Sequence, residues 1–490
     1  MPVSWTKPRK FDRNLIVIGA GAAGLVSSYI AAMAKAKVTL IEAHDMGGDC
    51  LNTGCVPSKA LLKSARVAHS ARDAARYGIG TGEISVDFPR VMQRIREVIT
   101  AIEPHDSIER YTGLGVECLT GYARFVDPWT VDIAKADGSS QRLTAKAFVI
   151  ATGAAPVVPP IPGVESSGYL TSETLWAEMA TRSTAPARLT ILGGGPIGCE
   201  LAQAFQRLGS QVTLVEMADR LMLKEDAEAA TLVTETLRLE GVDVRTGHKA
   251  VRFDAGKQLV VEAAGVPSVI AYDDVIIAVG RKARVTGFGL EELGLVVDGR
   301  LAVDAKLATA MPHIFVAGDV AGNQQLTHGA SHEAWYATVN ALARPFKSYK
   351  ADYRALPRVT YTDPEVASVG LTEADATAQG IAYDVTRYSL DDLDRAIADG
   401  EAHGFVKILT APGKDRMLGV TIVASHAGEM IAELVFAMRH NLPLGKLMAA
   451  IHSYPTWSEA NKFAAGQYRL ARKPERLQRL AQRWFDWQRG

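Results

Sequence analysis

Two stretches of this chain repeat one pattern, and no other feature limits its possible folds as strongly. Leu15 to Glu42 (LIVIGAGAAGLVSSYIAAMAKAKVTLIE) aligns without a gap with Leu189 to Glu216 (LTILGGGPIGCELAQAFQRLGSQVTLVE), and each stretch is 28 residues long. In both, an apolar segment is followed by a GxGxxG turn, an amphipathic segment with helical spacing and a second apolar segment that ends in an acid. The repeat therefore predicts two βαβ units in an α/β fold.

The glycines and acids of the repeat lie at matching positions, 174 residues apart. The first unit contains Gly19, Gly21, Gly24 and Glu42, and the second contains Gly193, Gly195, Gly198 and Glu216. Glycines at this spacing allow a tight turn and let a pyrophosphate approach the N–H groups at a helix N-terminus, while the terminal acid accepts hydrogen bonds from a ribose. Chance glycine-rich loops are the alternative, but two copies in matching context favour two dinucleotide sites.

Two dinucleotide sites in one chain indicate a relay, in which one nucleotide stays bound and the other exchanges. The acid at Glu216 favours a free ribose 2′-hydroxyl over a 2′-phosphate, and so predicts NADH rather than NADPH. The neighbouring Arg220 could still meet a phosphate, which leaves NADPH possible.

Length and charge exclude several other classes of protein. The 490 residues suggest about three or four domains, and a net charge of zero gives no broad electrostatic footprint for nucleic acid or an anionic membrane. Four cysteines cannot form a disulfide scaffold, and the first residues lack the apolar stretch of a secretory signal, so we expect a reducing cytoplasm. Two uncharged stretches, 15–34 and 147–164, are too rich in glycine or proline for membrane spans, so no transmembrane segment is expected.

A pair of cysteines follows the first repeat in the segment GGDCLNTGCVPSK, residues 47–59. In a regular helix, Cys50 and Cys55 would be too far apart for a disulfide. A loop that opens into a helix, bent at Gly54 and with Pro57 in the first turn, would bring them together. A cysteine at a helix N-terminus near Lys59 should have a lowered thiol pKa. The alternatives are two buried thiols or half of a zinc site, but the other two cysteines lie in unrelated contexts and no metal is expected.

Three motifs in this chain resemble those of the class I pyridine nucleotide-disulfide oxidoreductases, and the similarity covers essentially the whole chain. GGDCLNTGCVPSK is close to the redox-active disulfide signature of that family, and Ala151–Thr152–Gly153 matches its ATG turn. The segment MPHIFVAGD, residues 311–319, matches its second flavin motif. The resemblance implies FAD in the first site, NAD(P)H in the second and a homodimer.

The resemblance also implies roles for individual residues. Cys50 and Cys55 would form the redox disulfide beside the flavin, with Cys55 as the charge-transfer thiol and Cys50 as the interchange thiol. Lys59 and Glu200 match a family ion pair near the flavin, although an ordinary pair on a helix surface is the alternative. The remaining positions implied to bind a cofactor are Gly48, Thr152, Gly153, Gly280, Arg281, Gly318, Asp319 and Thr327. Arg281 could equally belong to a structural turn.

By the same resemblance the chain divides into four domains. Residues 1–155 would bind FAD and contain the disulfide, 156–283 would bind NAD(P), 284–352 would complete the FAD site, and 353–490 would form the dimer interface. The expected fold is α/β, with two Rossmann-like dinucleotide-binding domains and an α+β C-terminal dimerisation domain.

The chain departs from the family pattern near its C-terminus, in IHSYPTWSE, residues 451–459. Thiol-active members have a histidine just before Pro-Thr, which pairs with a glutamate five positions later and is the acid/base for the interchange thiol of the other subunit. Here the glutamate is Glu459, but Tyr454 occupies the histidine position. Tyrosine has a pKa near 10 and is a poor base at pH 7, whereas His452 could substitute if the loop curls inward.

The departure leaves three hypotheses for the reaction. The first is a dihydrolipoamide dehydrogenase-like enzyme that acts on a small or carrier-bound dithiol or disulfide. The second is a mercuric reductase-like enzyme for a metal ion or another non-thiol acceptor, favoured by Tyr454 but opposed by the absence of a C-terminal cysteine pair. The third is a flavoprotein subunit that docks to a carrier or complex.

The third hypothesis rests on the tail from Arg472 to Gly490, RKPERLQRLAQRWFDWQRG. Its spacing predicts a helix with Leu477, Leu480, Trp484 and Trp487 on one side among arginines. We expect this helix to pack on its own dimer, with docking to a partner or a membrane surface as the alternatives.

Overall fold

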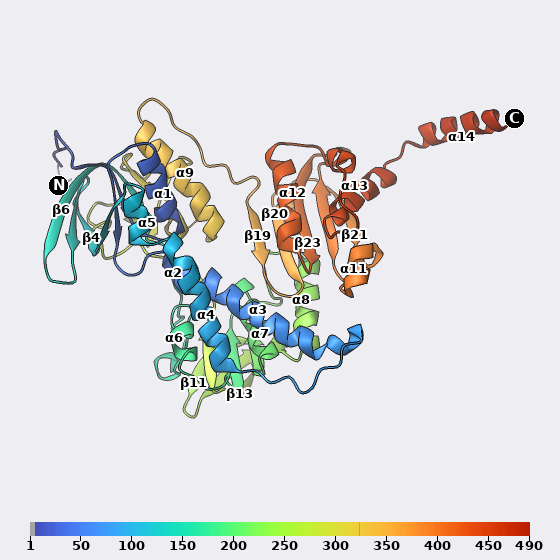
Figure 1. Cartoon of the computed structure of the whole chain (residues 1–490), viewed down its shortest axis with the longest axis horizontal. Coiled ribbons are helices and arrows are strands. Elements are labelled where there is room, and N and C mark those ends of the chain that lie inside the picture. Colours follow the sequence, from blue (N-terminus) through green and yellow to red (C-terminus); the bar gives the residue numbers. More distant parts are fainter. Residues whose placement is uncertain (1–4, 323) are drawn as a thin grey trace. The chain divides into compact units, whose positions relative to one another are not determined.

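The structure is a computed structural model that describes residues 5–322 and 324–490 (Figure 1). The chain forms two compact units, one made of the residues up to 217 together with 241–352, and the other made of residues 218–240 and 353–490. The four predicted domains do not coincide with these two units, because residues 218–240 of the predicted 156–283 domain belong to the second unit, and the four domains stay a prediction. In the described parts of the chain, no helix has both the length and the apolar character needed to cross a bilayer.

The first repeat forms the centre of a sheet in the first unit. Arg13–Ile18 is strand β1, Ala22–Met33 is helix α1 and Val38–Glu42 is strand β2, as the pattern predicted. The parallel strands are β3 (Glu117–Thr120), β2, β1, β6 (Ser140–Ile150) and β18 (Ile314–Val316), and β6 continues into the antiparallel strands β5 (Thr130–Ala134) and β4 (Tyr122–Asp127).

Both faces of this sheet are buried, which explains why its central strands are almost continuously apolar. Leu15 and Val17 face a core that includes residues of α1 and α9 (Thr327–Ala343). Ile16 and Ile18 face the other side, where they pack with Phe125 and other residues of the antiparallel strands. Successive side chains of one strand thus anchor two separate layers.

The second repeat forms another parallel sheet with the same local geometry. Its elements are β8 (Arg188–Leu192), α7 (Pro196–Arg207) and β9 (Gln211–Val215), and the strand order is β10 (Asp243–Arg245), β9, β8, β14 (Asp274–Ile277). Leu189 pairs with Val212 in this sheet, as Leu15 pairs with Val38 in the first. The repeat in sequence is therefore also a repeat in strand register, and the predicted fold class is confirmed.

Shorter elements complete the first unit. An antiparallel sheet consists of β11 (Lys249–Asp254), β12 (Gln258–Ala263) and β13 (Val266–Ala271), and two-stranded ribbons pair β7 (Ala154–Pro156) with β15 (Arg281–Ala283) and β16 (Val296–Val297) with β17 (Arg300–Leu301). The helices are α2 (Gly48–Asn52), α3 (Cys55–Arg72), α4 (Phe88–Ile102), α5 (Ile108–Gly113) and α6 (Leu175–Met179). Helix α3 packs between α4 and α7, where Phe88 lies against Phe205.

The second unit is built on an antiparallel sheet. Its strand order is β19 (Pro357–Thr360), β20 (Glu365–Gly370), β23 (Met417–Ala424), β22 (Phe405–Thr410), β21 (Asp384–Ser389). The helices are α8 (Ala227–Leu239), α10 (Glu373–Ala378), α11 (Asp394–Asp399), α12 (Ala427–Arg439), α13 (Glu459–Ala471) and α14 (Glu475–Arg489). Helices α12 and α13 pack on the sheet, and their apolar side chains form one core with it.

Helix α8 belongs to this second unit although its sequence lies between the strands of the second repeat's sheet. The buried ammonium group of Lys407, in β22, connects α8 to this unit. It lies 2.9–3.0 Å from carboxylate oxygens of Asp226 and Glu228, at the start of α8, and of Glu373 in α10. Burial alone would lower the pKa of Lys407, but the hydrogen bonds to these three carboxylates raise it above its usual value. The sequence pattern did not indicate this cluster.

Replacement of Lys407 by methionine should therefore loosen α8. The change leaves carboxylates without their buried cation, and breaking such a cluster costs about 3–5 kcal/mol. We expect the amides of α8 to exchange hydrogen correspondingly faster, as measured by mass spectrometry on the intact holoenzyme. Lys414→Met, at an exposed position, is the matched control. Equal protection of the α8 amides from hydrogen exchange in both variants would show that Lys407 does not hold this helix in place.

Candidate active site

The two glycine turns have nearly the same backbone geometry. Gly19 and Gly193 have φ angles of 101° and 109°, which side chains other than glycine rarely adopt. A Cβ atom on either residue would lie 2.4 Å from a carbonyl oxygen of the neighbouring strand end, that of Ala151 or Ala278. Both first glycines are thus required for the tight turn between strand and helix.

The third glycines let each helix pack against its own turn. A Cβ atom on Gly24 would lie 1.7 Å from the carbonyl oxygen of Gly19, and one on Gly198 would lie 1.9 Å from that of Gly193. The middle glycines, Gly21 and Gly195, are the N-caps of α1 and α7, and neither helix start has a side-chain cap or an acid in its first turn. The first N–H groups of both helices therefore suit the pyrophosphate of a dinucleotide.

The middle glycines differ in their surroundings. A Cβ atom on Gly21 would lie 3.9 Å from the Cα atom of Gly48, and one on Gly48, whose φ is 57°, would lie 2.7 Å from the Cα atom of Gly21. No described atom lies within 4 Å of the same position on Gly195. The redox segment therefore covers the first turn, while the second turn is open.

The acids that end β2 and the second repeat support the turns directly. A carboxylate oxygen of Glu42 accepts a hydrogen bond from the N–H of Ala20, and one of Glu216 accepts from Gly194 at 2.7 Å. Ala20 and Gly194 each follow the first glycine of their turn. Both acids lie at the carboxyl end of their strand, where a ribose binds in this type of unit.

The two cysteines of the redox segment lie on either side of a break between two helices. Cys50 belongs to α2 and Cys55 is the first residue of α3. Gly54 forms the bend, where a Cβ atom would lie 2.9 Å from the carbonyl oxygen of Asp49. The expectation that Cys50 lies in a loop is wrong, because residues Gly48–Asn52 form a helical turn, closed by the N–H of Thr53 on the carbonyl of Asp49, to which the side chain of Asn52 adds bonds to the carbonyls of Met46 and Gly48.

The thiols of Cys50 and Cys55 have opposite acidities. The hydrogen bond from Cys50, helped by the hydroxyl of Thr327 at 3.3 Å and by the charge of Lys59, lowers the pKa of Cys55 to about 6. The same bond and burial raise the pKa of Cys50 above its usual value. In the dithiol form at pH 7, Cys55 is therefore a thiolate and Cys50 a thiol.

Lys59 and Glu200 form an ion pair, with 2.9 Å between the ammonium nitrogen and a carboxylate oxygen. Lys59 lies one turn after Cys55 on α3, and Glu200 lies in the first turns of α7. The side chain of Glu200 is 6% exposed and that of Lys59 is 36% exposed, so the pair is partly buried, and its role near the flavin stays a prediction. The ion pair brings α3, which begins at Cys55, together with α7, which follows the second glycine turn.

Arg281 lies at the redox segment rather than in an isolated turn. Its guanidinium forms an ion pair with Asp49, next to Cys50, and donates to the carbonyl of Ala154 at 2.7 Å. Its Nε lies 3.9 Å from a carboxylate oxygen of Asp319, whose pKa is raised to about 6 by burial. The residue before it, Gly280, has a φ of 129°. The sequence did not indicate the partner Asp49.

The other predicted flavin positions surround the first turn. The hydroxyl of Thr152 donates to the carbonyl of Arg284 at 2.7 Å, and Gly153 follows it with a φ of 69°. Gly318 fits between α1 and α9, where a Cβ atom would lie 3.1 Å from Ala23 and 3.3 Å from Ala330. These positions, with the uncapped helix α1, leave the backbone around the first turn suited to FAD.

The predicted acid/base residues lie in the second unit and have three different partners. The hydroxyl of Tyr454 donates to Asp394 at 2.9 Å, and this bond raises the tyrosine pKa. The Nε2 atom of His452 lies 3.0 Å from a carboxylate oxygen of Glu433 on α12, and only 8% of its side chain is exposed. Glu459 instead accepts from the N–H of Thr456 at 3.0 Å. Glu433 was missed because its partner lies 19 residues away in the chain.

Comparison with known proteins agrees with this geometry over most of the chain. The family model for pyridine nucleotide-disulphide oxidoreductases matches residues 13–334, and the model for the dimerisation domain of that family matches residues 356–465. A dihydrolipoamide dehydrogenase of Chaetomium thermophilum is 35% identical, over 93% of this chain and 90% of the relative. A mercuric reductase of Streptomyces lividans is 36% identical, over 92% and 95%.

A solved structure gives the same result. The crystal structure of LpdA from Mycobacterium tuberculosis superposes with a TM-score of 0.84 and 26% identity, over 93% of this chain and 99% of that one. The similarity extends through both units of the chain.

The low pKa of Cys55 can be tested by removing its hydrogen-bond donor. In Cys50→Ala the pKa should rise from about 6 toward the ordinary value of about 8.5, whereas Cys50→Ser retains a hydroxyl donor and should stay low. We expect the pH midpoint for alkylation of Cys55 by iodoacetamide, assigned by peptide mass spectrometry, to shift accordingly. Identical midpoints in the two variants would show that Cys50 does not set this pKa.

The second glycine turn can be tested with a pair of alanine substitutions. Gly195→Ala meets no described atom of the protein and should fold normally, but its methyl group enters the space that a pyrophosphate approaches, so the Kd for NADH should rise about tenfold or more. Gly198→Ala meets the carbonyl of Gly193 and should lower the thermal midpoint. Unchanged NADH affinity in Gly195→Ala, measured by calorimetry, would place the nucleotide elsewhere.

Proposed function

Because the chain belongs to the pyridine nucleotide-disulphide oxidoreductase family and is an FAD-dependent NAD(P)H:disulfide oxidoreductase, we propose that it acts on a dithiol or disulfide of the dihydrolipoamide type. The observation that carries this proposal is the placement of Cys50 and Cys55 on either side of the break between α2 and α3, with the Thr327 hydroxyl 3.3 Å from the sulfur of Cys55, where it helps to lower the pKa of that thiol. A thiolate of low pKa is a good leaving group in thiol–disulfide exchange, so the pair suits a thiol substrate.

FAD, when bound at the first glycine turn, supplies two-electron transfer between NAD(P)H and the disulfide. The residues of this chain would perform the exchange with a substrate dithiol. One substrate thiol loses its proton to a base and attacks the sulfur of Cys50, which breaks the Cys50–Cys55 bond and releases Cys55 as a thiolate. The second substrate sulfur then displaces Cys50, so the substrate leaves as a disulfide and the enzyme holds the dithiol.

We propose His452 as the base for this exchange, acting on the interchange thiol of the second subunit of the homodimer. Glu433 orients its Nε2 atom, and the Nδ1 atom, 3.3 Å from the carbonyl oxygen of Ala450, would take the proton. A carboxylate that accepts from one imidazole nitrogen fixes the orientation of the ring and stabilises its protonated form. Tyr454 is less suitable, because its hydrogen bond to Asp394 raises its pKa further from neutrality. Glu459 then accepts a hydrogen bond from the backbone of the loop and does not orient the acid/base group.

The proposed pyridine nucleotide is NADH. Glu216 lies at the end of β9, where it would accept from a ribose 2′-hydroxyl and repel a 2′-phosphate. Arg220, the residue that could have met such a phosphate, already donates to the carbonyls of Met222 and Leu223 at 3.1 and 2.8 Å. We also propose a reducing cytoplasm as the compartment, which suits the four free cysteines, and a substrate that is free or attached to a carrier.

A metal ion or another non-thiol acceptor is the second candidate substrate. It is favoured by Tyr454, whose side chain is 71% exposed at the position where thiol-active members have histidine, and the mercuric reductase of Streptomyces lividans is as similar as the dehydrogenase. Among residues 5–322 and 324–490, no specific contact favours a docking subunit as the main function.

Steady-state turnover of lipoamide with NADH, and of dihydrolipoamide with NAD, tests the proposal. The native enzyme should turn over both, more efficiently with NADH than with NADPH. His452→Gln should lower kcat/KM about 100-fold or more with loss of the pH dependence of the base, while Tyr454→Phe should change it little. His440→Gln, an exposed histidine after the same helix as Glu433, is the control.

The outcomes separate the candidates. No turnover of the dithiol pair by the native enzyme, with NADH-dependent reduction of Hg²⁺ or Cu²⁺ in its place, would support the metal acceptor. Full dithiol activity in His452→Gln together with its loss in Tyr454→Phe would assign the acid/base role to Tyr454 instead.

A further inference from the structure

Helix α14 carries an apolar face that nothing in its own unit covers. None of its residues is buried, and Leu477, Leu480, Trp484, Phe485 and Trp487 are each 53–71% exposed. The family models match residues 13–334 and 356–465, so this helix lies beyond the part of the chain that the shared function requires. Five large apolar side chains on one exposed helix are more than scattered surface residues explain.

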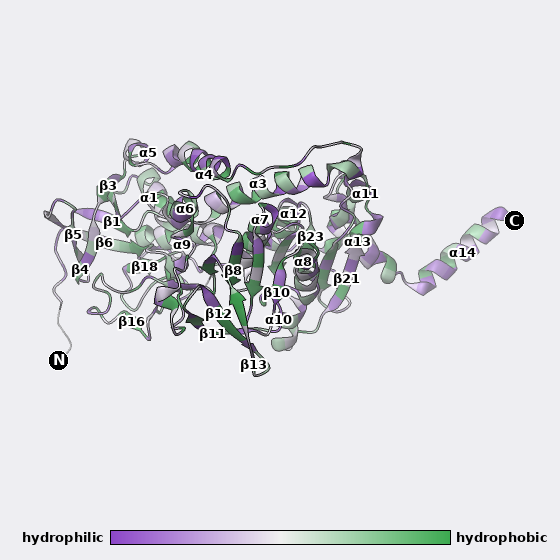
Figure 2. Ribbon diagram, turned by 90° about the horizontal axis from the view of Figure 1, so that it is seen from below, coloured by the Kyte–Doolittle hydropathy of each residue, from purple (hydrophilic) through white to green (hydrophobic). Residues whose placement is uncertain are grey.

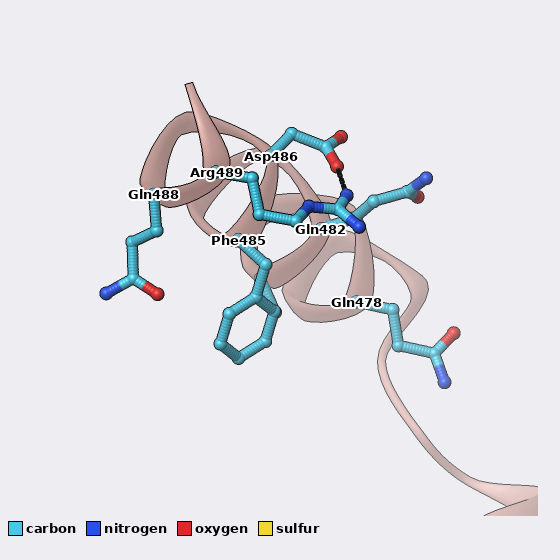
Figure 3. A pocket seen from close by; sticks show the side chains of 7 residues that line it. Gln478, Gln482, Phe485, Asp486, Gln488 and Arg489 are labelled. Atoms are coloured by element: carbon cyan, nitrogen blue, oxygen red, sulfur yellow. Dashed lines mark hydrogen bonds and ion pairs between the residues drawn. The ribbon is translucent and has the colours of Figure 1, made fainter.

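The apolar side chains lie on one side of the helix. Successive helical residues are rotated by about 100°, which places Leu477, Leu480 and Trp484 together, with Trp487 and Phe485 at the two edges of the face. Figure 2 shows the resulting division of α14 into hydrophilic and hydrophobic residues. In Figure 3 Phe485 lines a shallow hollow of the helix surface together with Asp486 and Arg489, whose side chains form an ion pair.

The charges beside this face are mainly basic. The segment from Arg472 to Gly490 contains five arginines and Lys473 against Glu475 and Asp486, in a chain whose net charge is zero. In the described structure Lys473, Arg476 and Arg483 form no ion pair, and the helical rotation places Arg476 and Arg483 next to the edge that Trp487 forms. Free cations therefore flank the tryptophans.

We propose that α14 binds in the interface of an anionic phospholipid bilayer, with its apolar face in the acyl boundary and its arginines at the headgroups. Tryptophan and leucine on one face with arginine at the flank is the pattern of helices that lie in this interface. Free phosphate would not cover the apolar face. A second copy of α14 would cover it but would bring like charges together, and a neutral partner would leave the free cations unpaired. The enzyme is then recruited peripherally.

Co-sedimentation of the full-length holoenzyme with lipid vesicles tests the proposal. We expect binding to vesicles of phosphatidylcholine with phosphatidylglycerol to exceed binding to pure phosphatidylcholine at least tenfold, and to fall at high salt. Trp484→Ala with Trp487→Ala, and separately Arg476→Glu with Arg483→Glu, should each lower it at least tenfold. Lys249→Glu with Arg300→Glu, a charge reversal of equal size on exposed strands, should bind like the native enzyme.

Disulfide turnover should be unchanged in all these variants, which separates this inference from the proposed function. No binding of the native enzyme to anionic vesicles would overturn it. Sedimentation equilibrium then tests whether the second subunit covers the apolar face of α14 instead. In that case the tryptophan variant would sediment with the mass of a monomer rather than a dimer. Equal binding to neutral and anionic vesicles would also overturn the anionic specificity.

Discussion

The ion pair between Lys59 and Glu200 is the interaction on which the arrangement of the redox centre depends. A carboxylate as buried as that of Glu200 is stable only with a cation and hydrogen bonds around it. The cation comes from α3, which begins at Cys55, and the carboxylate comes from α7, which begins beside Gly195. One buried carboxylate thus holds the start of α3, which carries Cys55, against the helix that would bind the pyridine nucleotide.

Much of the first unit follows from the sequence, because its strongest signal is local. The repeat specifies apolar strands and glycine turns, and both are read from residues close together in the chain, so even the shared strand register of Leu15 and Leu189 could be expected. The membership of α8 in the second unit could not be expected from the sequence, because it depends on Lys407, which lies 181 residues from Asp226. The helical turn at Cys50 was missed although its bonds are local, because a turn of five residues is too short to show a helical pattern in the sequence.

The C-terminal segment shows that a family motif can identify candidate acid/base residues without indicating their hydrogen-bond partners. Matching residue by residue identified His452, Tyr454 and Glu459, and the structure places the first two in a loop and Glu459 at the start of α13, but the match did not indicate their partners. Asp394 and Glu433 come from other helices, 60 and 19 residues away, and neither lies in a recognisable motif. The chemistry of an imidazole or a phenol depends more on such partners than on its place in a motif, so the choice between His452 and Tyr454 requires the three-dimensional contacts.

The difference between Gly21 and Gly195 has a kinetic consequence. Both begin helices of the same geometry, but the Cα atom of Gly48 lies against the first turn and no described atom lies as close to the second. A nucleotide bound at the first turn would be covered by the segment around Gly48, whereas one at the second turn would meet no such cover. The same motif, duplicated within one chain, would therefore favour slower release at the first site than at the second, as a resident and a diffusing carrier of electrons require.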